Sequence, residues 1–292
     1  MTNGNDNAPR STIEVAEGAG VCFGVKRALR LAEEALSAGT PVYSLGPLIH
    51  NPQEVGRLAE KGFTVIESLE EARPGATLVI RSHGVSPDVV AEARRRGLEV
   101  VDATCPLVRR VQTLAMELEQ DGYRVVVAGD APHPEVRAIL GHAPHAVVVG
   151  EVEAVDGLDL GGRVALVAQT TFSPGLFREM AAALVRRDPD DVRIVRTICT
   201  ATVERQRAAA ELAARVDTML VIGGRNSANT NRLAERCAAD GVPTHHVEVA
   251  DEVRPEWLAG RPRVGVTAGA STPQWIIDAV CRRIRLLQSS HG

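Results

Sequence analysis

Short apolar runs alternate with stretches of helical periodicity along almost the whole chain. Such an alternation favours parallel β-sheets joined by right-handed helical crossovers. The runs with the length and β-branched side chains of strands are residues 13–16, 41–44, 64–66, 77–80, 100–102, 124–128, 146–149, 164–167, 193–195, 218–222, 244–247 and 263–267. These are too many strands for one small sheet, so we expect several α/β units.

One sequence element recurs in each third of the chain. Residues 13–22, 98–105 and 192–199 each form a predicted strand and a short turn that ends in a cysteine, directly before a predicted helix. Cys105 follows Cys22 by 83 residues (105 − 22), and Cys199 follows Cys105 by 94 residues (199 − 105). The pattern predicts three similar parallel-sheet α/β units around a pseudo-threefold axis, with one cysteine from each facing the middle.

The spacing of these elements also predicts the domain boundaries. We expect a disordered N-terminal tip over residues 1–12. The first α/β domain is expected over residues 23–105 and the second over 106–198. Residues 199–292 are expected to form the third domain together with 13–22.

Composition narrows the class of protein. The formal charge is −4, from 33 basic and 37 acidic residues, which gives no overall field that attracts nucleic acid or an anionic membrane. No run approaches the roughly 18 apolar residues of a membrane span, and residues 1–12 lack the apolar core of a signal peptide. We therefore expect a cytoplasmic protein that binds neither nucleic acid nor a membrane. Any anionic ligand must be held by a local site.

Five widely spaced cysteines without a Cys-x-x-Cys pair argue against a disulfide framework or a zinc ribbon. Cys237 and Cys281 lie within helical patterns and are expected to be buried and inert. Cys22, Cys105 and Cys199 instead precede helices, whose N-termini favour a thiolate. Three convergent thiolates can hold either zinc with an open position or a 4Fe-4S cluster with one iron lacking a cysteine ligand, and the spacing does not choose.

Histidines stand at three other strand ends, beside helices that begin with proline. His50, His83 and His133 precede or adjoin Pro52, Pro87 and Pro134. Imidazole donors together with free helix N–H groups form a site for a phosphate-like anion. The remaining histidines are expected to be structural: His142, His145, His245, His246 and His291.

Two further loops suit the same anion. Ser227 and Asn229, in residues 223–233, and Ser271, in residues 267–274, follow predicted strands at helix starts. Their side chains can donate to phosphate oxygens, although the same residue types cap helices in any protein. Combined with the three histidines, the two loops favour a diphosphate ligand.

Two polar positions suggest proton chemistry. Glu135 follows His133 at a strand end, where it can relay protons or simply interact favourably with the helix dipole. Thr170, in residues 168–173, follows the strand 164–167, where its hydroxyl can contact a substrate or stabilise a turn.

Taken together, nine short motifs in order resemble the 4-hydroxy-3-methylbut-2-enyl diphosphate reductases of the non-mevalonate isoprenoid pathway, over residues 13–287. The motifs are residues 20–25, 49–51, 82–85, 102–108, 133–136, 169–171, 197–202, 226–233 and 267–271. The resemblance implies a three-domain α/β enzyme around a central 4Fe-4S cluster held by Cys22, Cys105 and Cys199.

The resemblance further implies an iron-sulfur oxidoreductase. Its open iron would bind the allylic hydroxyl of the substrate as a Lewis acid. Two electrons from a ferredoxin or flavodoxin would then break the C–O bond with loss of water. Protonation gives isopentenyl or dimethylallyl diphosphate.

Carried over by position, His50, His83, Ser227, Asn229 and Ser271 would bind the diphosphate. His133 would assist in binding the diphosphate. Glu135 would be the proton source or relay, and Thr170 would be hydrogen-bonded to the substrate hydroxyl.

The chain departs from the family pattern at two places. Ala228 stands where a second serine is usual, and Arg137-Ala138 stand where a glutamate and a glycine are usual. These changes leave open a paralogue that acts on a related allylic diphosphate. From the residues alone, a Cys/His zinc hydrolase of a phosphorylated substrate is also open.

Overall fold

The computed structural model describes residues 12–159, 162–239 and 241–289. The chain divides into two compact units, which we describe separately: unit 1 contains residues 1–22 and 204–292, and unit 2 contains residues 23–203. Apart from Thr12, the predicted N-terminal tip lies outside the described residues.

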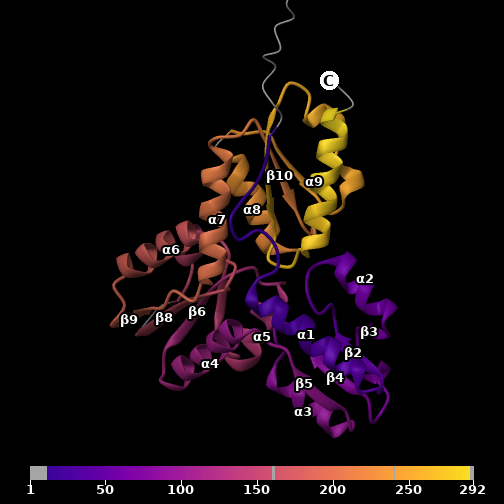
Figure 1. The fold of residues 1–292 in the computed structure, drawn as a ribbon. Coiled ribbons are helices and arrows are strands. Elements are labelled where there is room, and N and C mark those ends of the chain that lie inside the picture. The colour runs from indigo at the N-terminus through magenta and orange to yellow at the C-terminus, as the bar shows by residue number, and fades with distance from the viewer. Residues whose placement is uncertain (1–11, 160–161, 240, 290–292) are drawn as a thin grey trace, which may run out of the picture. The chain divides into compact units, whose positions relative to one another are not determined.

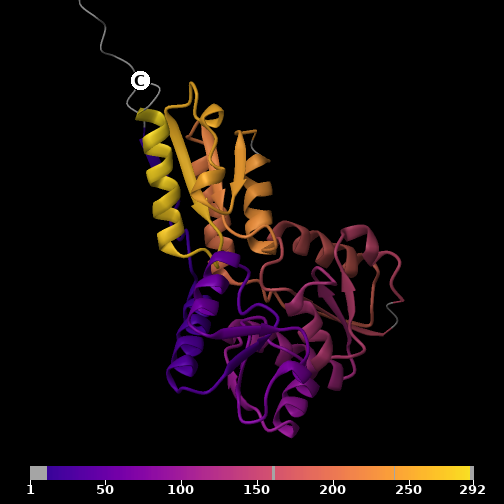
Figure 2. The same ribbon diagram turned by 90° about the vertical axis from the view of Figure 1, so that its right-hand side faces the viewer.

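Unit 2 contains two four-stranded parallel sheets, of which the first has the strand order β3-β2-β4-β5. Its strands are β2 (Val42–Leu45), β3 (Phe63–Ile66), β4 (Thr77–Ile80) and β5 (Glu99–Asp102). Its helices are α1 (Phe23–Ser37), α2 (Pro52–Glu60) and α3 (Pro87–Arg95). Helix α1, drawn in indigo, lies along this sheet in both views (Figures 1 and 2) and contacts β2 and β4.

The second sheet of unit 2 has the order β7-β6-β8-β9 and is also parallel. Its strands are β6 (Arg124–Ala128), β7 (Val147–Val149), β8 (Arg163–Ala168) and β9 (Asp191–Ile194). Its helices are α4 (Pro106–Gln120), α5 (Pro134–His142) and α6 (Pro174–Arg186). Alternate strand residues face opposite ways: Val126 and Leu166 pack with α6, and Val125 and Val167 pack with α4 and α5.

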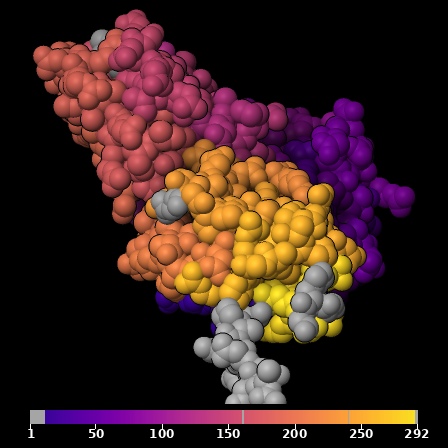
Figure 3. Space-filling model, turned by 90° about the horizontal axis from the view of Figure 1, so that it is seen from above, coloured from indigo at the N-terminus to yellow at the C-terminus, as the bar shows by residue number. Residues whose placement is uncertain are grey.

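Unit 1 contains the third parallel sheet, with the order β1-β12-β10-β11. Its strands are β1 (Thr12–Val15), β10 (Thr218–Ile222), β11 (Thr244–Val247) and β12 (Arg263–Ala268). Its helices are α7 (Thr200–Ala213), α8 (Ala228–Ala238) and α9 (Gln274–Ser289). Met219 and Val221 pack against α7 and α8, whereas Leu220 and Ile222 pack against α9. Figure 3 shows one face of this unit, in orange to yellow.

The three sheets share one topology. In each, the first strand is internal, the second lies outside it, the third lies on its other side, and the fourth forms the far edge. In unit 1 that fourth strand is β1, which brings the N-terminal residues into the sheet of the C-terminal third. The prediction of three similar parallel-sheet α/β units is therefore confirmed.

The compact units separate after Cys22 and after Val203. The finer division of unit 2 into domains over residues 23–105 and 106–198 stays a prediction.

The prolines and the apolar runs mark the helix starts and the strands as the sequence analysis predicts. Pro52, Pro87, Pro106 and Pro134 each occupy the first position of a helix, where the missing N–H costs no hydrogen bond. All the predicted strands are present, with ends that differ by at most two residues. In the described part of the chain, every helix is too short or too polar to cross a bilayer.

Candidate active site

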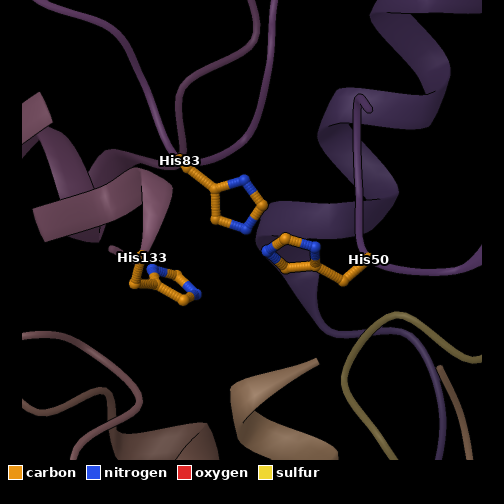
Figure 4. A group of neighbouring side chains, drawn as sticks. All are labelled: His50, His83 and His133. Atoms are coloured by element: carbon orange, nitrogen blue, oxygen red, sulfur yellow. The ribbon is translucent and has the colours of Figure 1, made fainter. Parts of the chain in front are cut away.

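Three histidines from three loops of unit 2 form one cluster. His50 follows β2, His83 follows β4, and His133 is the N-cap of α5. The ring centroids lie 4.4 Å apart for His50 and His83 and 5.4 Å apart for the other two pairs. The rings turn toward a common space (Figure 4), and one nitrogen of each lies within 4.8 Å of the others. The structure thus brings together the three histidines that the sequence singles out.

Burial keeps His50 and His83 uncharged near neutral pH. It lowers the pKa of His50 to about 4, with a further contribution from the positive charge of Arg81. Burial also lowers the pKa of His83 well below its usual value, assisted by repulsion from His50, His133 and Arg81. An anion between the rings would favour their charged forms and reverse these shifts.

His83 also has a buried nitrogen available for a ligand. Its Nδ1 makes no hydrogen bond within the described part of the chain. Buried polar atoms are almost always paired in native structures, so an atom of this kind suggests a missing ligand.

The loop that carries His83 is fixed by glycine geometry and by two polar side chains. Gly84 has a positive φ of 74°, and a β-carbon there would collide with the amide of Gln112. That amide donates to the carbonyl of His83 at 3.3 Å. The hydroxyl of Ser82 donates to the carbonyl of Leu48 at 3.2 Å, which ties the His83 loop to the loop before His50.

Glu135 and Thr170 form a buried pair beside the cluster. The backbone N–H of Thr170 donates to one carboxylate oxygen of Glu135 at 2.6 Å, and the Thr170 hydroxyl donates to the other at 2.8 Å. The backbone N–H of Glu135 in turn donates to Nδ1 of His133 at 3.1 Å. Helix α5 therefore presents an imidazole and a carboxyl group at the same N-terminus.

Burial dominates the titration of Glu135. Its side chain is 1% exposed, and loss of solvation raises its pKa to about 7, against the opposing effect of the two hydrogen bonds from Thr170. A carboxylic acid with a pKa near the working pH is suited to general acid catalysis.

Each of the three predicted ligand cysteines makes the same kind of backbone hydrogen bond. In unit 2, the N–H of Cys105 donates to the carbonyl of Ser82 at 2.9 Å, and that of Cys199 donates to Thr170 at 2.9 Å. In unit 1, the N–H of Cys22 donates to the carbonyl of Ala270 at 3.1 Å. All three cysteines are half-buried and none of them forms a disulfide.

In each sheet, this hydrogen bond joins the loop after the fourth strand to the loop after the third strand. It places each cysteine loop against a loop that carries a predicted substrate residue, namely His83, Thr170 or Ser271. The recurring cysteine element of the sequence thus has an equivalent structural setting in all three sheets.

The sulfur of Cys105 lies close to the start of α1. The residue is the N-cap of α4 but makes no side-chain capping bond. A β-carbon at Gly24 would lie 2.6 Å from its sulfur, so α1 can approach only through a glycine. The guanidinium of Arg27 donates to the carbonyls of Thr104 and Asp102, at 3.1 Å each, and fixes the loop. Half-buried thiols at helix starts are a donor set that fits an iron-sulfur cluster.

The polar loops of unit 1 hold the other predicted anion ligands. The oxygen of Ser227 caps α8 by accepting the N–H of Thr230 at 3.3 Å, which leaves its hydroxyl hydrogen able to donate. Nδ2 of Asn229 is buried and, over the described residues, unpaired. Ser271, which follows β12, is 6% exposed.

The backbone around these loops is closely packed. Gly223, with a φ of 150°, lies so near Thr230 that a β-carbon would approach its hydroxyl to 2.8 Å. The loop between β10 and the start of α8 can therefore adopt this conformation only with glycine at position 223.

Sequence reasoning missed residues that hold the loops in place. Arg205 in α7 is 4% exposed and donates to the carbonyls of Gly18 and Gly20, at 3.0 and 2.8 Å, before Cys22. Gln112 fixes His83 in the same way. No motif marks these residues, because their partners lie 29 to 187 positions away in the sequence.

Cys237 and Cys281, in contrast, are buried in α8 and α9 as expected.

The fold and these groups define a three-sheet α/β protein with a cluster of three histidines, a buried carboxyl group and three half-buried thiols at helix starts. Comparison with known proteins agrees with this description. The LytB protein family matches residues 13–285, and the chain belongs to this family.

Named relatives match over nearly the whole chain. The 4-hydroxy-3-methylbut-2-enyl diphosphate reductase of Geobacter metallireducens is 49% identical over 279 residues, which cover 95% of this chain and 98% of the relative. The enzyme of the same name from Pelobacter propionicus is 48% identical over 271 residues, 92% of this chain and 96% of the relative. The family resemblance drawn from the nine motifs is confirmed.

Two solved structures are also similar. A structure of (E)-4-hydroxy-3-methyl-but-2-enyl diphosphate reductase, described as the terminal enzyme of the non-mevalonate pathway, is 43% identical with a TM-score of 0.71, and the match covers 94% of this chain and 99% of that one. The E-1-hydroxy-2-methyl-but-2-enyl-4-diphosphate reductase of Plasmodium falciparum is 27% identical with a TM-score of 0.89, covering 95% and 88%.

Proposed function

We propose that this chain is a 4-hydroxy-3-methylbut-2-enyl diphosphate reductase. The observation that carries the proposal is the buried pair of Glu135 and Thr170 beside the histidine cluster, in a chain of the LytB family. The reaction consumes two electrons and two protons. One proton leaves with the hydroxyl as water, the other adds to the allyl carbon, and the product is isopentenyl or dimethylallyl diphosphate.

The histidines bind the diphosphate in this proposal. His50 and His83, with assistance from His133, face one space and are uncharged when that space holds no anion. A diphosphate there raises their pKa values and turns the rings into charged donors. From unit 1, the hydroxyls of Ser227 and Ser271 and the amide of Asn229 supply further donors.

The acid pair delivers the proton. With Glu135 protonated, its carboxyl donates to the Thr170 oxygen, and the Thr170 hydroxyl donates to the leaving hydroxyl of the substrate. The bond of 2.8 Å between the two side chains is short enough for such a relay. Burial keeps the carboxyl available in its protonated form near pH 7.

Cys22, Cys105 and Cys199 hold a 4Fe-4S cluster in this proposal. When bound, the cluster supplies electrons one at a time and an iron without a cysteine ligand that acts as a Lewis acid. The electron donor, a ferredoxin or flavodoxin, and the cytoplasmic location stay predictions of the proposal.

One observation favours a second candidate, a zinc hydrolase of a phosphorylated substrate. The three imidazole nitrogens lie within 4.8 Å of one another, close enough to coordinate one metal ion. A hydrolase of that kind is active in air and needs no reductant.

Anaerobic turnover separates the candidates. The purified chain is mixed with 4-hydroxy-3-methylbut-2-enyl diphosphate and a chemical reductant, and the products are identified by chromatography. The proposal predicts both isopentenyl and dimethylallyl diphosphates only when the reductant is present. Release of phosphate in air without reductant would favour the hydrolase, and turnover confined to another allylic diphosphate would identify a paralogue.

A further inference from the structure

A second basic pocket lies in unit 2, with its own lining apart from the three histidine rings. It has a volume of about 260 Å³, and Arg81, Arg137, Ser86 and Glu67 supply its charged and hydroxyl side chains. Arg81 directly follows β4, and Arg137 lies one helical turn after His133 in α5. We call this the arginine pocket.

Several arginines among the described residues form ion pairs, but the two arginines of this pocket do not. Arg57, for example, forms ion pairs with Glu33 and Glu54. Within the described residues, neither Arg81 nor Arg137 makes an ion pair or a hydrogen bond, and Nε of Arg81 is buried without a partner. A buried donor without an acceptor costs free energy that a bound anion would recover.

The charges in the pocket do not balance. Burial lowers the pKa of Arg81, and repulsion from Arg137 lowers it further. Glu67 opposes this shift, but its side chain is exposed and accepts no bond from either guanidinium. The lining therefore keeps a net positive charge, from two guanidinium groups against one carboxylate.

The remaining groups suit a small oxyanion. Ser86 is the N-cap of α3, a helix of nine residues, but its side chain makes no capping bond and its hydroxyl can donate to a ligand. The volume lies below the range of about 300 to 1,000 Å³ that is typical of pockets for larger ligands. One phosphate group fits this size, and guanidinium groups are the preferred donors to its oxygens.

We propose that the arginine pocket is a second anion site, which binds a phosphate group between Arg81 and Arg137. The ligand is free phosphate or the phosphate end of a small monoester. This site does not depend on the proposed reaction, because its lining includes none of the residues assigned to catalysis.

Arg137 is the better position for a test. The charge of Arg81 also acts on His50 and His83, so a change at Arg81 would affect both anion sites. Arg137 is exposed on α5, and Arg137→Glu leaves the folded core unaltered. Arg178→Glu is the matched control, since Arg178 is an exposed arginine near the start of α6.

Binding of inorganic phosphate to the full chain is measured by calorimetry under anaerobic conditions. The histidine site is first weakened with His83→Ala, and the part of the remaining phosphate binding that Arg137→Glu then removes reports the arginine pocket. Adding Arg137→Glu should weaken that binding at least about tenfold, as expected for the loss of a charged donor. Adding Arg137→Lys should restore part of it, and adding Arg178→Glu should leave it unchanged.

Glycerol phosphate in a parallel titration identifies the source of the phosphate group. Binding as tight as that of inorganic phosphate assigns a monoester, and markedly weaker binding assigns the free ion. The proposal is overturned if the His83→Ala protein binds neither ligand, or if Arg137→Glu leaves its affinity unchanged. Both results are independent of turnover, so they leave the proposed reductase activity untouched.

Discussion

Replacing Glu135 by glutamine tests the proton source directly. Among the described residues, the carboxyl group has no arginine or lysine partner and accepts two hydrogen bonds from Thr170. The backbone N–H of the same residue donates to His133. Glutamine keeps the size of the side chain and an oxygen for the Thr170 N–H. The substitution therefore removes the titrating proton while it retains the packing.

The size of the effect follows from the pKa. A rise from 4.5 to about 7 favours the protonated form by about 3 kcal/mol. At pH 7 about half of the molecules then carry the proton, against roughly one in 300 for an ordinary glutamate. Loss of a general acid reduces kcat by about 10² to 10⁴.

The assay is anaerobic turnover with saturating substrate from pH 6 to pH 9. Because the acid must be protonated, wild-type kcat should fall as the pH rises through about 7. Glu135→Gln should remove this dependence along with most of the activity. Infrared difference spectra of the two proteins should show a protonated carboxyl band that titrates at the same pH.

Glu54 supplies a matched control. It is also a buried glutamate in the first turn of a helix after proline, but it forms an ion pair with Arg57. Glu54→Gln should change kcat by less than about threefold, since its carboxyl is paired with Arg57. The reasoning is refuted if the carboxyl band of Glu135 titrates near 4.5, or if Glu135→Gln retains wild-type kcat.

Three further predictions concern the histidine cluster. His83→Ala should raise KM by about tenfold to a hundredfold with a smaller effect on kcat, because it removes a charged donor to the diphosphate; steady-state kinetics would separate the two constants. Gly84→Ala should lower the free energy of unfolding by about 1 to 3 kcal/mol, because alanine disfavours a φ of 74° and collides with Gln112; denaturant titration measures it. The pKa of His50 in the folded protein is about 4, below the usual 6.5, so between these values the unfolded chain binds one proton more than the folded chain. The contribution of His50 to the free energy of unfolding is therefore complete above about pH 6.5. It falls by up to about 3 kcal/mol as the pH decreases toward 4. The drop in Tm from pH 7 to pH 5 should be smaller in His50→Gln, and an unchanged drop would contradict the assignment.

The sequence predicted the strands and helix starts because their signals are local. A proline such as Pro106 and the apolar run before it act within a few residues, and the structure places both as expected. The recurrence of Cys22, Cys105 and Cys199 likewise predicted three similar units, since one topology repeats the same strand end.

The residues that fix the site could not be predicted in this way. Arg205 and Gln112 donate to carbonyls far away in the sequence, so no spacing rule reveals them. The raised pKa of Glu135 also depends on burial by the whole unit, and its sequence position was equally typical of a first-turn glutamate. Arg137 was visible as a departure from the family pattern, but its pairing with Arg81 in one pocket required the fold.

The central claim is that three equivalent strand-end cysteines hold one redox group. The direct test is iron and sulfide analysis, with the visible spectrum, of anaerobically purified single variants. Cys22→Ser, Cys105→Ser and Cys199→Ser should each lose most of the iron and the brown colour. Cys237→Ser, at a buried position in α8, should retain both. Full iron in any of the first three variants, or stoichiometric zinc in the wild-type protein, would contradict the account.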